Sequence, residues 1–192
     1  MKEVGKAIIL FIFAIGIFPI SLLHAGIKDG CVVERAVFEL GSGVTTVAVA
    51  TVNKCTNTIV KLQKQVHKSM PYQTYLNTSA DKKTLPKNAI EKGIAKIQEA
   101  KKELGIDCNN ISCVGIATAA MRNAKNGNIA VKQISQETKV NVHVISQKEE
   151  GWIGYHAAVI KENISDKEQK EIMMLDIGGV AIKPYTQIRM SV

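Results

Sequence analysis

Arginine is scarce in this sequence of 192 residues, and neither an internal repeat nor a low-complexity segment is present. Hydrophobic residues make up 46% of the chain and charged residues 22%, which excludes a disordered polymer, a collagen-like repeat and a multi-span membrane protein. The lysines behind the net charge of +8 are scattered along the chain. Because a nucleic-acid-binding face concentrates its positive charge on one element, we interpret this charge as a solvated surface and expect no nucleic-acid partner.

The first 25 residues differ in composition from the rest. Lys2 and Lys6 precede an uncharged run from Ala7 to Leu23, and Ala25 then offers a small residue ahead of Gly26. This layout is typical of a secretory signal peptide, so we expect residues 1–25 to be cleaved and the mature protein to be exported without a membrane span. The alternative is an uncleaved anchor, because the run is near the short end of the ~17–25 residues that span a bilayer.

All four cysteines lie beyond this segment. An even number of cysteines in an exported chain suggests disulfides. If strands flank the Gly41-Ser42-Gly43 turn, Cys31 and Cys55 fall nearly opposite one another, and Cys108 and Cys113 could close a short loop. The alternative is four free, partly buried thiols. A metal site is disfavoured because neither a CxxC nor a paired-histidine spacing accompanies the cysteines.

Apolar periodicity in the body predicts the element order βββαβαβα followed by one more strand. Residues 69–83 are polar and turn-like, while Thr84 is expected to cap a helix that has Pro86 in its first turn. Three consecutive strands followed by α/β crossovers indicate an α/β fold with a mixed sheet. The expected strands are 34–40, 44–52, 57–68, 111–118, 140–146 and 171–177, and the expected helices are 84–104, 122–138 and 147–162.

Two segments at predicted strand ends could bind an anion. Glu39-Leu40-Gly41-Ser42-Gly43 follows a strand, and its glycines would let backbone N–H groups approach a phosphate; the alternative is a plain hairpin. Arg122 follows the strand that ends near Thr118, at the end of an α/β strand where ligands usually bind. Its planar guanidinium suits a phosphate, and the alternative is a surface ion pair.

Two further segments place carboxylates where strands end. Glu149 and Glu150 lie where a strand becomes a helix, although acidic residues are common in a first turn because of the helix dipole. Asp176 ends an apolar strand before Gly178 and Gly179, a placement that suits a metal–phosphate site.

The order and spacing of these segments resemble the exopolyphosphatase / guanosine pentaphosphate phosphatase (Ppx/GppA) family over roughly residues 35–179. The matching segments are Glu39-Leu40-Gly41-Ser42-Gly43 for D-x-G-S-N, Thr118 to Arg122 for T-x-A-x-R with Ala124 and Asn126 also fitting, Ile145 to Gly151 for I-S-G-x-E-E-A, and Asp176 to Gly179 for D-I-G-G-G-S.

The resemblance implies a ribonuclease-H-like domain of the actin-like ATPase superfamily and removal of a terminal phosphate from a phosphoanhydride. Polyphosphate or a phosphorylated nucleotide such as pppGpp would be the substrate. The signal-like N-terminus together with a bacterial family leads us to expect the periplasm as the location. Glu150 would act as general base, and Asp176 with Glu39 would hold Mg²⁺. The residues expected to bind phosphate are Gly41, Ser42, Arg122, Gly178 and Gly179.

The sequence also departs from the family pattern. Glu39 replaces an aspartate, Gly43-Val44 replaces Asn-Ser, and Gln147 replaces a glycine. The match stops after Gly179, so we expect a signal peptide over 1–25, an N-terminal domain over 26–165, the start of a second domain over 166–179, and an aberrant tail of no clear structure over 180–192.

The break after Gly179 suggests a one-base frameshift, since codons for Val-Ala-Ile-Lys shifted by one base can encode Gly-Ser. The chain would then be truncated and weakly active or inactive alone. The main alternative is a non-catalytic, exported anion-binding module of the same fold. A kinase relative that uses ATP is a weaker alternative, because the Glu-Glu segment fits the phosphatases better.

Overall fold

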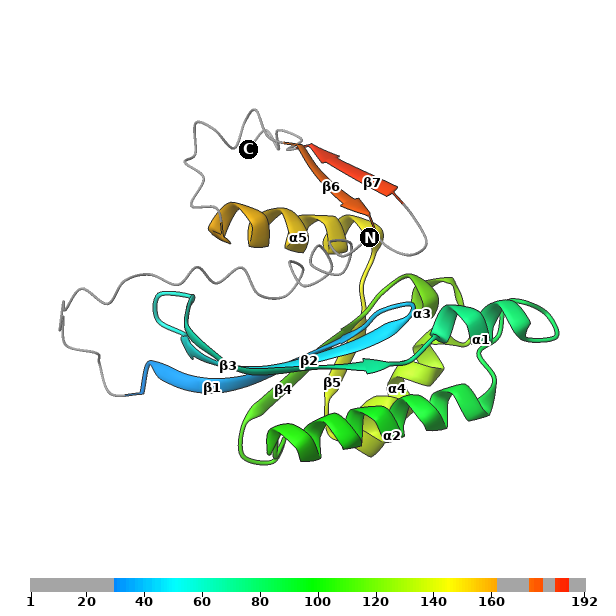
Figure 1. The fold of residues 1–192 in the computed structure, drawn as a ribbon, viewed down its shortest axis with the longest axis horizontal. Coiled ribbons are helices and arrows are strands. Elements are labelled where there is room, and N and C mark those ends of the chain that lie inside the picture. Colours follow the sequence, from blue (N-terminus) through cyan, green and yellow to red (C-terminus); the bar gives the residue numbers. More distant parts are fainter. Residues whose placement is uncertain (1–29, 162–172, 178–181, 187–192) are drawn as a thin grey trace, which may run out of the picture. The chain divides into compact units, whose positions relative to one another are not determined.

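The computed structural model describes residues 30–161, 173–177 and 182–186, with side chains through residue 157 (Figure 1). The predicted signal peptide and Gly178-Gly179 lie outside these residues. Within the described part of the chain, no helix has the length and apolar character that a membrane crossing requires. Two compact units are present, and the boundary between them falls between Ser146 and Gln147.

The first unit contains the mixed sheet expected from the sequence. Its strand order is β3-β2-β1-β4-β5; β1 and β3 are antiparallel to β2, whereas β4 is parallel to β1 and β5 is parallel to β4. Parallel neighbours need helical crossovers, which α2 to α4 provide. The strands are β1 (Val32–Leu40), β2 (Val44–Asn53), β3 (Thr58–Ser69), β4 (Ser112–Ala117) and β5 (Asn141–Val144), and the helices are α1 (Tyr72–Thr78), α2 (Lys87–Leu104), α3 (Ala119–Asn123) and α4 (Gly127–Thr138).

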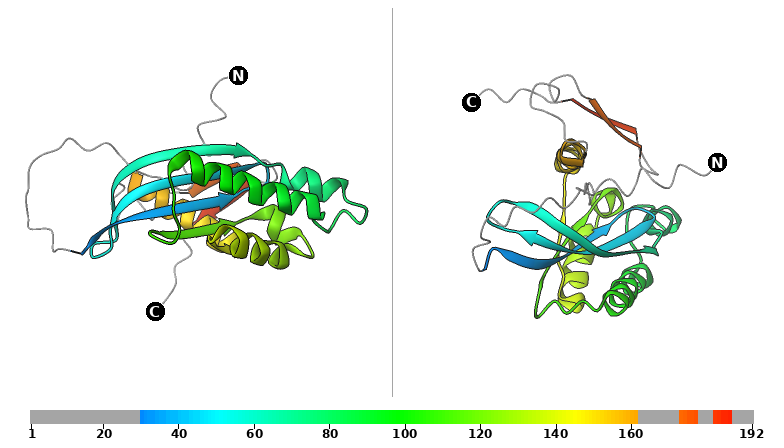
Figure 2. Two further views of the ribbon diagram at one scale, coloured as in Figure 1. Left: turned by 90° about the horizontal axis from the view of Figure 1, so that it is seen from below. Right: turned by 60° about the vertical axis from the view of Figure 1, so that its left-hand side comes forward.

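The core lies between the sheet and the helices α2 and α4, which lie together on one face of the sheet (Figure 2). Every second residue of β1 from Ala36 to Leu40 is buried, as strand geometry requires of one face. Ile94 and Ile97 of α2 are buried at helical spacing. Burial of this apolar surface is the main force that holds the sheet and helices together.

Two helix expectations need correction. Residues 69–83 are not all turn-like, because Tyr72–Thr78 forms α1 around the buried side chains of Tyr72 and Leu76. The single helix expected over 122–138 is divided into α3 and α4, and the chain between them is extended at Ala124. The break allows Gly127 to pack on Met121, since a Cβ on Gly127 would overlap the Met121 carbonyl oxygen.

The expected cap of α2 is also wrong. Pro86, not Thr84, occupies the cap position, in an extended conformation. The Thr84 hydroxyl instead donates a hydrogen bond to Asp81 Oδ2 at 2.8 Å, and the Thr84 N–H donates to Asp81 Oδ1. The Asp81 carboxylate thus binds the Thr84 hydroxyl that was expected to cap the helix, and it organises the loop before α2.

The second unit contains α5 (Gln147–Lys161), β6 (Met173–Ile177) and β7 (Ile182–Thr186). Strands β6 and β7 pair in antiparallel fashion, with Asp176 opposite Lys183. The expectation that residues 180–192 have no clear structure is therefore wrong for Ile182–Thr186. Alternation of Ile182, Pro184 and Thr186 with polar Lys183 gave only a weak strand signal, and pairing with β6 supplies the backbone hydrogen bonds.

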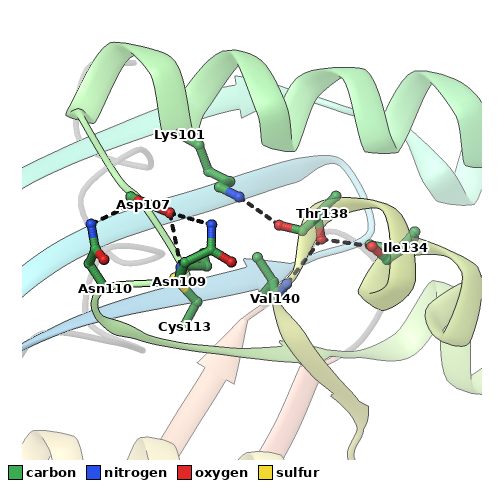
Figure 3. The surroundings of a disulfide bond; sticks show 9 residues. Lys101, Asp107, Asn109, Asn110, Cys113, Ile134, Thr138 and Val140 are labelled. Carbon is green, nitrogen blue, oxygen red and sulfur yellow. Dashed lines mark hydrogen bonds between the residues drawn. A yellow bond between two sulfur atoms is a disulfide. The ribbon is translucent and has the colours of Figure 1, made fainter.

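Two disulfides tie the sheet at the end away from the Gly41-Ser42-Gly43 turn. Cys31 bonds Cys55 across the β1–β2 hairpin, and Cys108, in the connection from α2 to β4, bonds Cys113 in β4. Beside the second disulfide, Lys101 donates to the Thr138 carbonyl at 2.6 Å (Figure 3). Burial lowers the pKa of Lys101, and its ammonium joins the end of α2 to the end of α4.

Candidate functional site

Three parallel strands of the first unit end side by side. Leu40, Ala117 and Val144 are register partners at the ends of β1, β4 and β5. The backbone continues this alignment, because Thr118 N–H donates to the Leu40 carbonyl at 3.2 Å and Ile145 N–H donates to the Ala117 carbonyl at 3.1 Å. We call the segments that follow these strands the strand-end edge: residues 41–43, 118–122 and 145–146. Such an edge is the usual ligand site in an open α/β sheet.

The glycine turn is held tightly at this edge. Gly41 N–H donates to the Val44 carbonyl at 3.0 Å, while the carbonyls of Ser42 and Gly43 accept from Gln73 and Met70. A Cβ on Gly41 would lie 2.9 Å from the Val44 oxygen, so the turn excludes a side chain there. The N–H groups of Ser42 and Gly43 have no acceptor in the described part of the chain. Two successive donors of this kind suit an anion.

Glu39 precedes the turn on the face of the sheet away from the core helices. Its register partner in β2 is Thr46, whose own partner in β3 is His67. Thr46 is buried, and its hydroxyl lies 3.2 Å from His67 Nδ1. One carboxylate oxygen of Glu39 lies 4.0 Å from the position that a Gly41 Cβ would take. Glu39, which is one methylene longer than the aspartate of the family pattern, therefore places its carboxylate beside the glycine turn.

Arg122 joins two of the three segments at the strand-end edge. Its N–H donates to the Thr118 carbonyl at 2.9 Å, and its Nη1 donates to the Ile145 carbonyl at 2.9 Å. Buried Ala120 and Met121 anchor the short helix α3 that carries it. The guanidinium is thus fixed between the end of β4 and the end of β5.

The acidic pair lies in the second unit. Glu149 and Glu150 occupy the first turn of α5, where the helix dipole favours negative charge. Glu149 is exposed, whereas Glu150 is only 8% exposed. A buried carboxylate close to a helix N-terminus is held more firmly than an exposed one, which suits a group that must orient a water molecule.

The residues expected to hold Mg²⁺ fit only in part. Asp176 lies at the fourth position of β6, and Glu39 lies beside the glycine turn. Among the residues described with side chains, no group of three or more His, Cys, Asp or Glu could hold a metal. Magnesium usually takes one or two carboxylates together with water and substrate phosphates, so Glu39 fits as one such ligand rather than as part of an all-protein cage.

Sequence reasoning did not give a role to Asn126 or to the loop that precedes α2. Asn126 pairs with the backbone of Leu85, accepting from its N–H and donating to its carbonyl, each at 2.9 Å. Lys125 N–H donates to the Lys83 carbonyl at 2.7 Å. The only signal in the sequence was the spacing of Asn126 from Arg122, which could not identify its partner.

Comparisons with known proteins match most of the chain. The sequence model of the Ppx/GppA phosphatase family matches residues 44–183. This range contains Arg122, Glu150 and Asp176 and runs past Gly179, where the resemblance was expected to stop. It does not include the segment from Glu39 to Gly43.

One curated relative and two solved structures illustrate the match. A bifunctional 3-dehydroquinate synthase/phosphatase from Fusobacterium nucleatum is 26% identical over 149 residues, which are 76% of this chain and 22% of that protein. A Ppx/GppA family member from Aquifex aeolicus is 22% identical with a TM-score of 0.59, covering 79% of this chain and 46% of its own. A second Aquifex aeolicus structure, described as a PPX-GPPA enzyme, is 19% identical with a TM-score of 0.61 and coverages of 80% and 48%. The chain thus spans less than half the length of these relatives.

Proposed function

The chain belongs to the Ppx/GppA phosphatase family and has its actin-like ATPase fold, and from this premise we propose that its strand-end edge binds the terminal phosphates of polyphosphate or of a phosphorylated nucleotide. Family membership supports a domain of the phosphoanhydride hydrolase type. The proposal adds the substrate class and the residues that contact it.

The observation that carries the proposal is the position of Arg122 relative to the glycine turn. The glycine turn directly follows Leu40, and the segment that ends with Arg122 directly follows Ala117, the register partner of Leu40. Both segments belong to one compact unit. A phosphoryl group in transfer carries charge on its oxygens and needs fixed donors and positive charge around them. The guanidinium of Arg122 and the N–H groups of Ser42 and Gly43 would supply both, and Gly178 and Gly179 would supply further donors.

The reaction requires a base for the attacking water, and we assign this role to Glu150. Its carboxylate accepts a proton from water as the water oxygen bonds to the terminal phosphorus. The bond from that phosphorus to the bridging oxygen breaks, which releases orthophosphate and a substrate shortened by one phosphate. Bound Mg²⁺ would neutralise substrate charge, and Glu39 and Asp176 are the residues proposed to hold it.

Export to the periplasm is part of the proposal. The N-terminal pattern of residues 1–25 supports it, and so do the disulfides Cys31–Cys55 and Cys108–Cys113, since disulfides persist in oxidising compartments. Mass spectrometry of the protein from a periplasmic extract would show a mature N-terminus at Gly26. A chain that keeps Met1 and stays in the cytoplasm would contradict this.

A non-catalytic anion-binding module is the second candidate. The segment from Glu39 to Gly43 favours it, because Glu39 and Gly43 replace the family's aspartate and asparagine and the family match begins only at Val44. This candidate predicts binding of tripolyphosphate without hydrolysis.

Phosphate release separates the two candidates. We would incubate the purified chain with tripolyphosphate and Mg²⁺ and measure orthophosphate. The phosphatase predicts slow but measurable release that Glu150→Gln lowers about 100-fold or more, the range for loss of a general base. Glu149→Gln, the adjacent exposed acid, is the matched control and should keep the rate. Binding of tripolyphosphate with no release above background would support the non-catalytic module.

A further inference from the structure

Asn126 uses its side chain in an unusual way for the residue before a helix. It occupies the N-cap position of α4, where an asparagine commonly accepts a hydrogen bond from the first turn. Here the side chain makes no capping bond to its own helix. It reaches instead to Leu85, 41 residues away in sequence, and forms both hydrogen bonds to that backbone. The Asn126 amide therefore makes two long-range hydrogen bonds to the Leu85 backbone in place of a local capping bond.

The partner of Asn126 is a well-anchored segment. Leu85 is 2% exposed and belongs to the main apolar cluster. The loop before it is organised by Asp81, which accepts from the N–H groups of Lys83 and Thr84. These hydrogen bonds hold the pKa of the Asp81 carboxyl well below its usual range. Lys125 adds a backbone bond to Lys83, so two consecutive residues, 125 and 126, are fastened to this loop.

Gly127, the residue after Asn126, connects this fastened loop to the backbone of Arg122. A Cβ on Gly127 would overlap the Met121 carbonyl oxygen and would lie 2.8 Å from the carbonyl carbon. That carbonyl belongs to the peptide group whose N–H is the N–H of Arg122. The backbone of Gly127 therefore packs directly on the peptide that carries Arg122, and only glycine permits this approach.

We propose that Asn126 and Gly127 are positioning residues for Arg122: the Asn126 amide clamps the start of α4 to Leu85, and Gly127 presses that start against the Met121–Arg122 peptide. The proposal rests on the proposed function, in which Arg122 contacts substrate phosphate. Arg122 is held at its tip by the Ile145 carbonyl and at its backbone by this contact. Both ends must be fixed for its planar donors to keep one orientation.

The test measures the NMR signal of the Arg122 side chain. The sequence has three arginines, Arg35, Arg122 and Arg189, so the Nε–Hε signal of Arg122 can be assigned in an NMR spectrum with Arg122→Lys. We would record this signal and the Kd for tripolyphosphate in the full chain and in Asn126→Ala, Asn126→Asp and Gly127→Ala. Asn128→Ala is the matched control, because Asn128 is exposed on the same turn of α4. Circular dichroism would establish that each variant is folded.

We expect Asn126→Ala and Gly127→Ala to shift the Arg122 signal and raise the Kd about tenfold. Asn126→Asp keeps the acceptor for Leu85 N–H and should have an intermediate effect, while Asn128→Ala should match the wild type. A folded Asn126→Ala variant with an unchanged Arg122 signal and unchanged Kd would overturn the proposal, even if its melting temperature fell. A further outcome is a shifted Arg122 signal with an unchanged Kd in every variant, including Arg122→Ala. That outcome would support the positioning of Arg122 and contradict its role in anion binding.

Discussion

At the scale of single residues, the site depends on the missing side chain of Gly41 and on the long side chain of Arg122. Gly41 leaves room for the Val44 carbonyl, and Arg122 bridges the ends of β4 and β5 through Thr118 and Ile145. The identities of these two residues could be selected from the sequence as candidates. Their contacts could not, because both depend on which strand ends become neighbours in the sheet.

Gly41→Ala should destabilise the protein and weaken anion binding. Its Cβ would lie 2.9 Å from the Val44 oxygen, so the turn must shift, at a cost of about 1–3 kcal/mol as in other overpacked sites. Gly43→Ala is the steric control, because a Cβ there meets no heavy atom within 4 Å. Urea unfolding of the two variants would measure the difference, and equal stabilities would contradict the steric account of the turn.

Glu99 should titrate unusually low. Hydrogen bonds from Lys68 and then Lys96 lower the pKa of its carboxyl to about 2. The pKa of the Glu99 carboxyl is lower in the folded state than in the unfolded state. The hydrogen bonds from the lysines therefore contribute fully to the free energy of unfolding above the ordinary pKa near 4.5, and this contribution is lost as the pH falls toward 2. An NMR titration of the Glu99 carboxyl should show this pKa, and Lys68→Met should move it upward. A titration near the ordinary value in the wild type would contradict the interaction.

At the scale of elements, strands were predicted well because β1 to β3 are rich in β-branched residues. Helix α1 was missed because its sequence, YQTYLNT, contains weak helix formers, and burial of Tyr72 and Leu76 in the core stabilises it. The division between α3 and α4 was missed although Asn126-Gly127 at the break is a local turn signal. Nothing local marks the contact of Gly127 with Met121, which is a tertiary contact across the break.

The disulfides make an element-scale prediction. Placement around the hairpin pairs Cys31 with Cys55, and the structure contains this bond over a separation of 24 residues, against 5 for Cys108–Cys113. In the chain-entropy account, the longer loop stabilises by about 3.5 kcal/mol and the shorter by about 2 kcal/mol. Replacing each pair by alanine and measuring unfolding should therefore show the larger loss for Cys31–Cys55, and the reverse order would contradict this account.

At the scale of the whole molecule, the α/β fold could be inferred from the order of strands and helices, and the family from the order of four short segments. The family match and the Aquifex aeolicus structures agree with that inference. The placement of the acidic pair relative to Arg122 could not be inferred, because Glu150 and Arg122 belong to different compact units. The first unit by itself contains Gly41, Ser42 and Arg122, all beyond the ends of neighbouring strands, so anion binding is the property to measure on this unit.

The central claim is that Arg122 at the strand-end edge binds terminal phosphates, and calorimetric titration with tripolyphosphate tests it most directly. Arg122→Lys keeps the charge but removes the planar donor set, whereas Arg35→Lys changes an arginine near the start of β1, at the opposite end of that strand from the glycine turn. We predict that Arg122→Lys raises the Kd at least about tenfold and that Arg35→Lys leaves it unchanged. Equal affinities for the wild type and both variants would contradict the account.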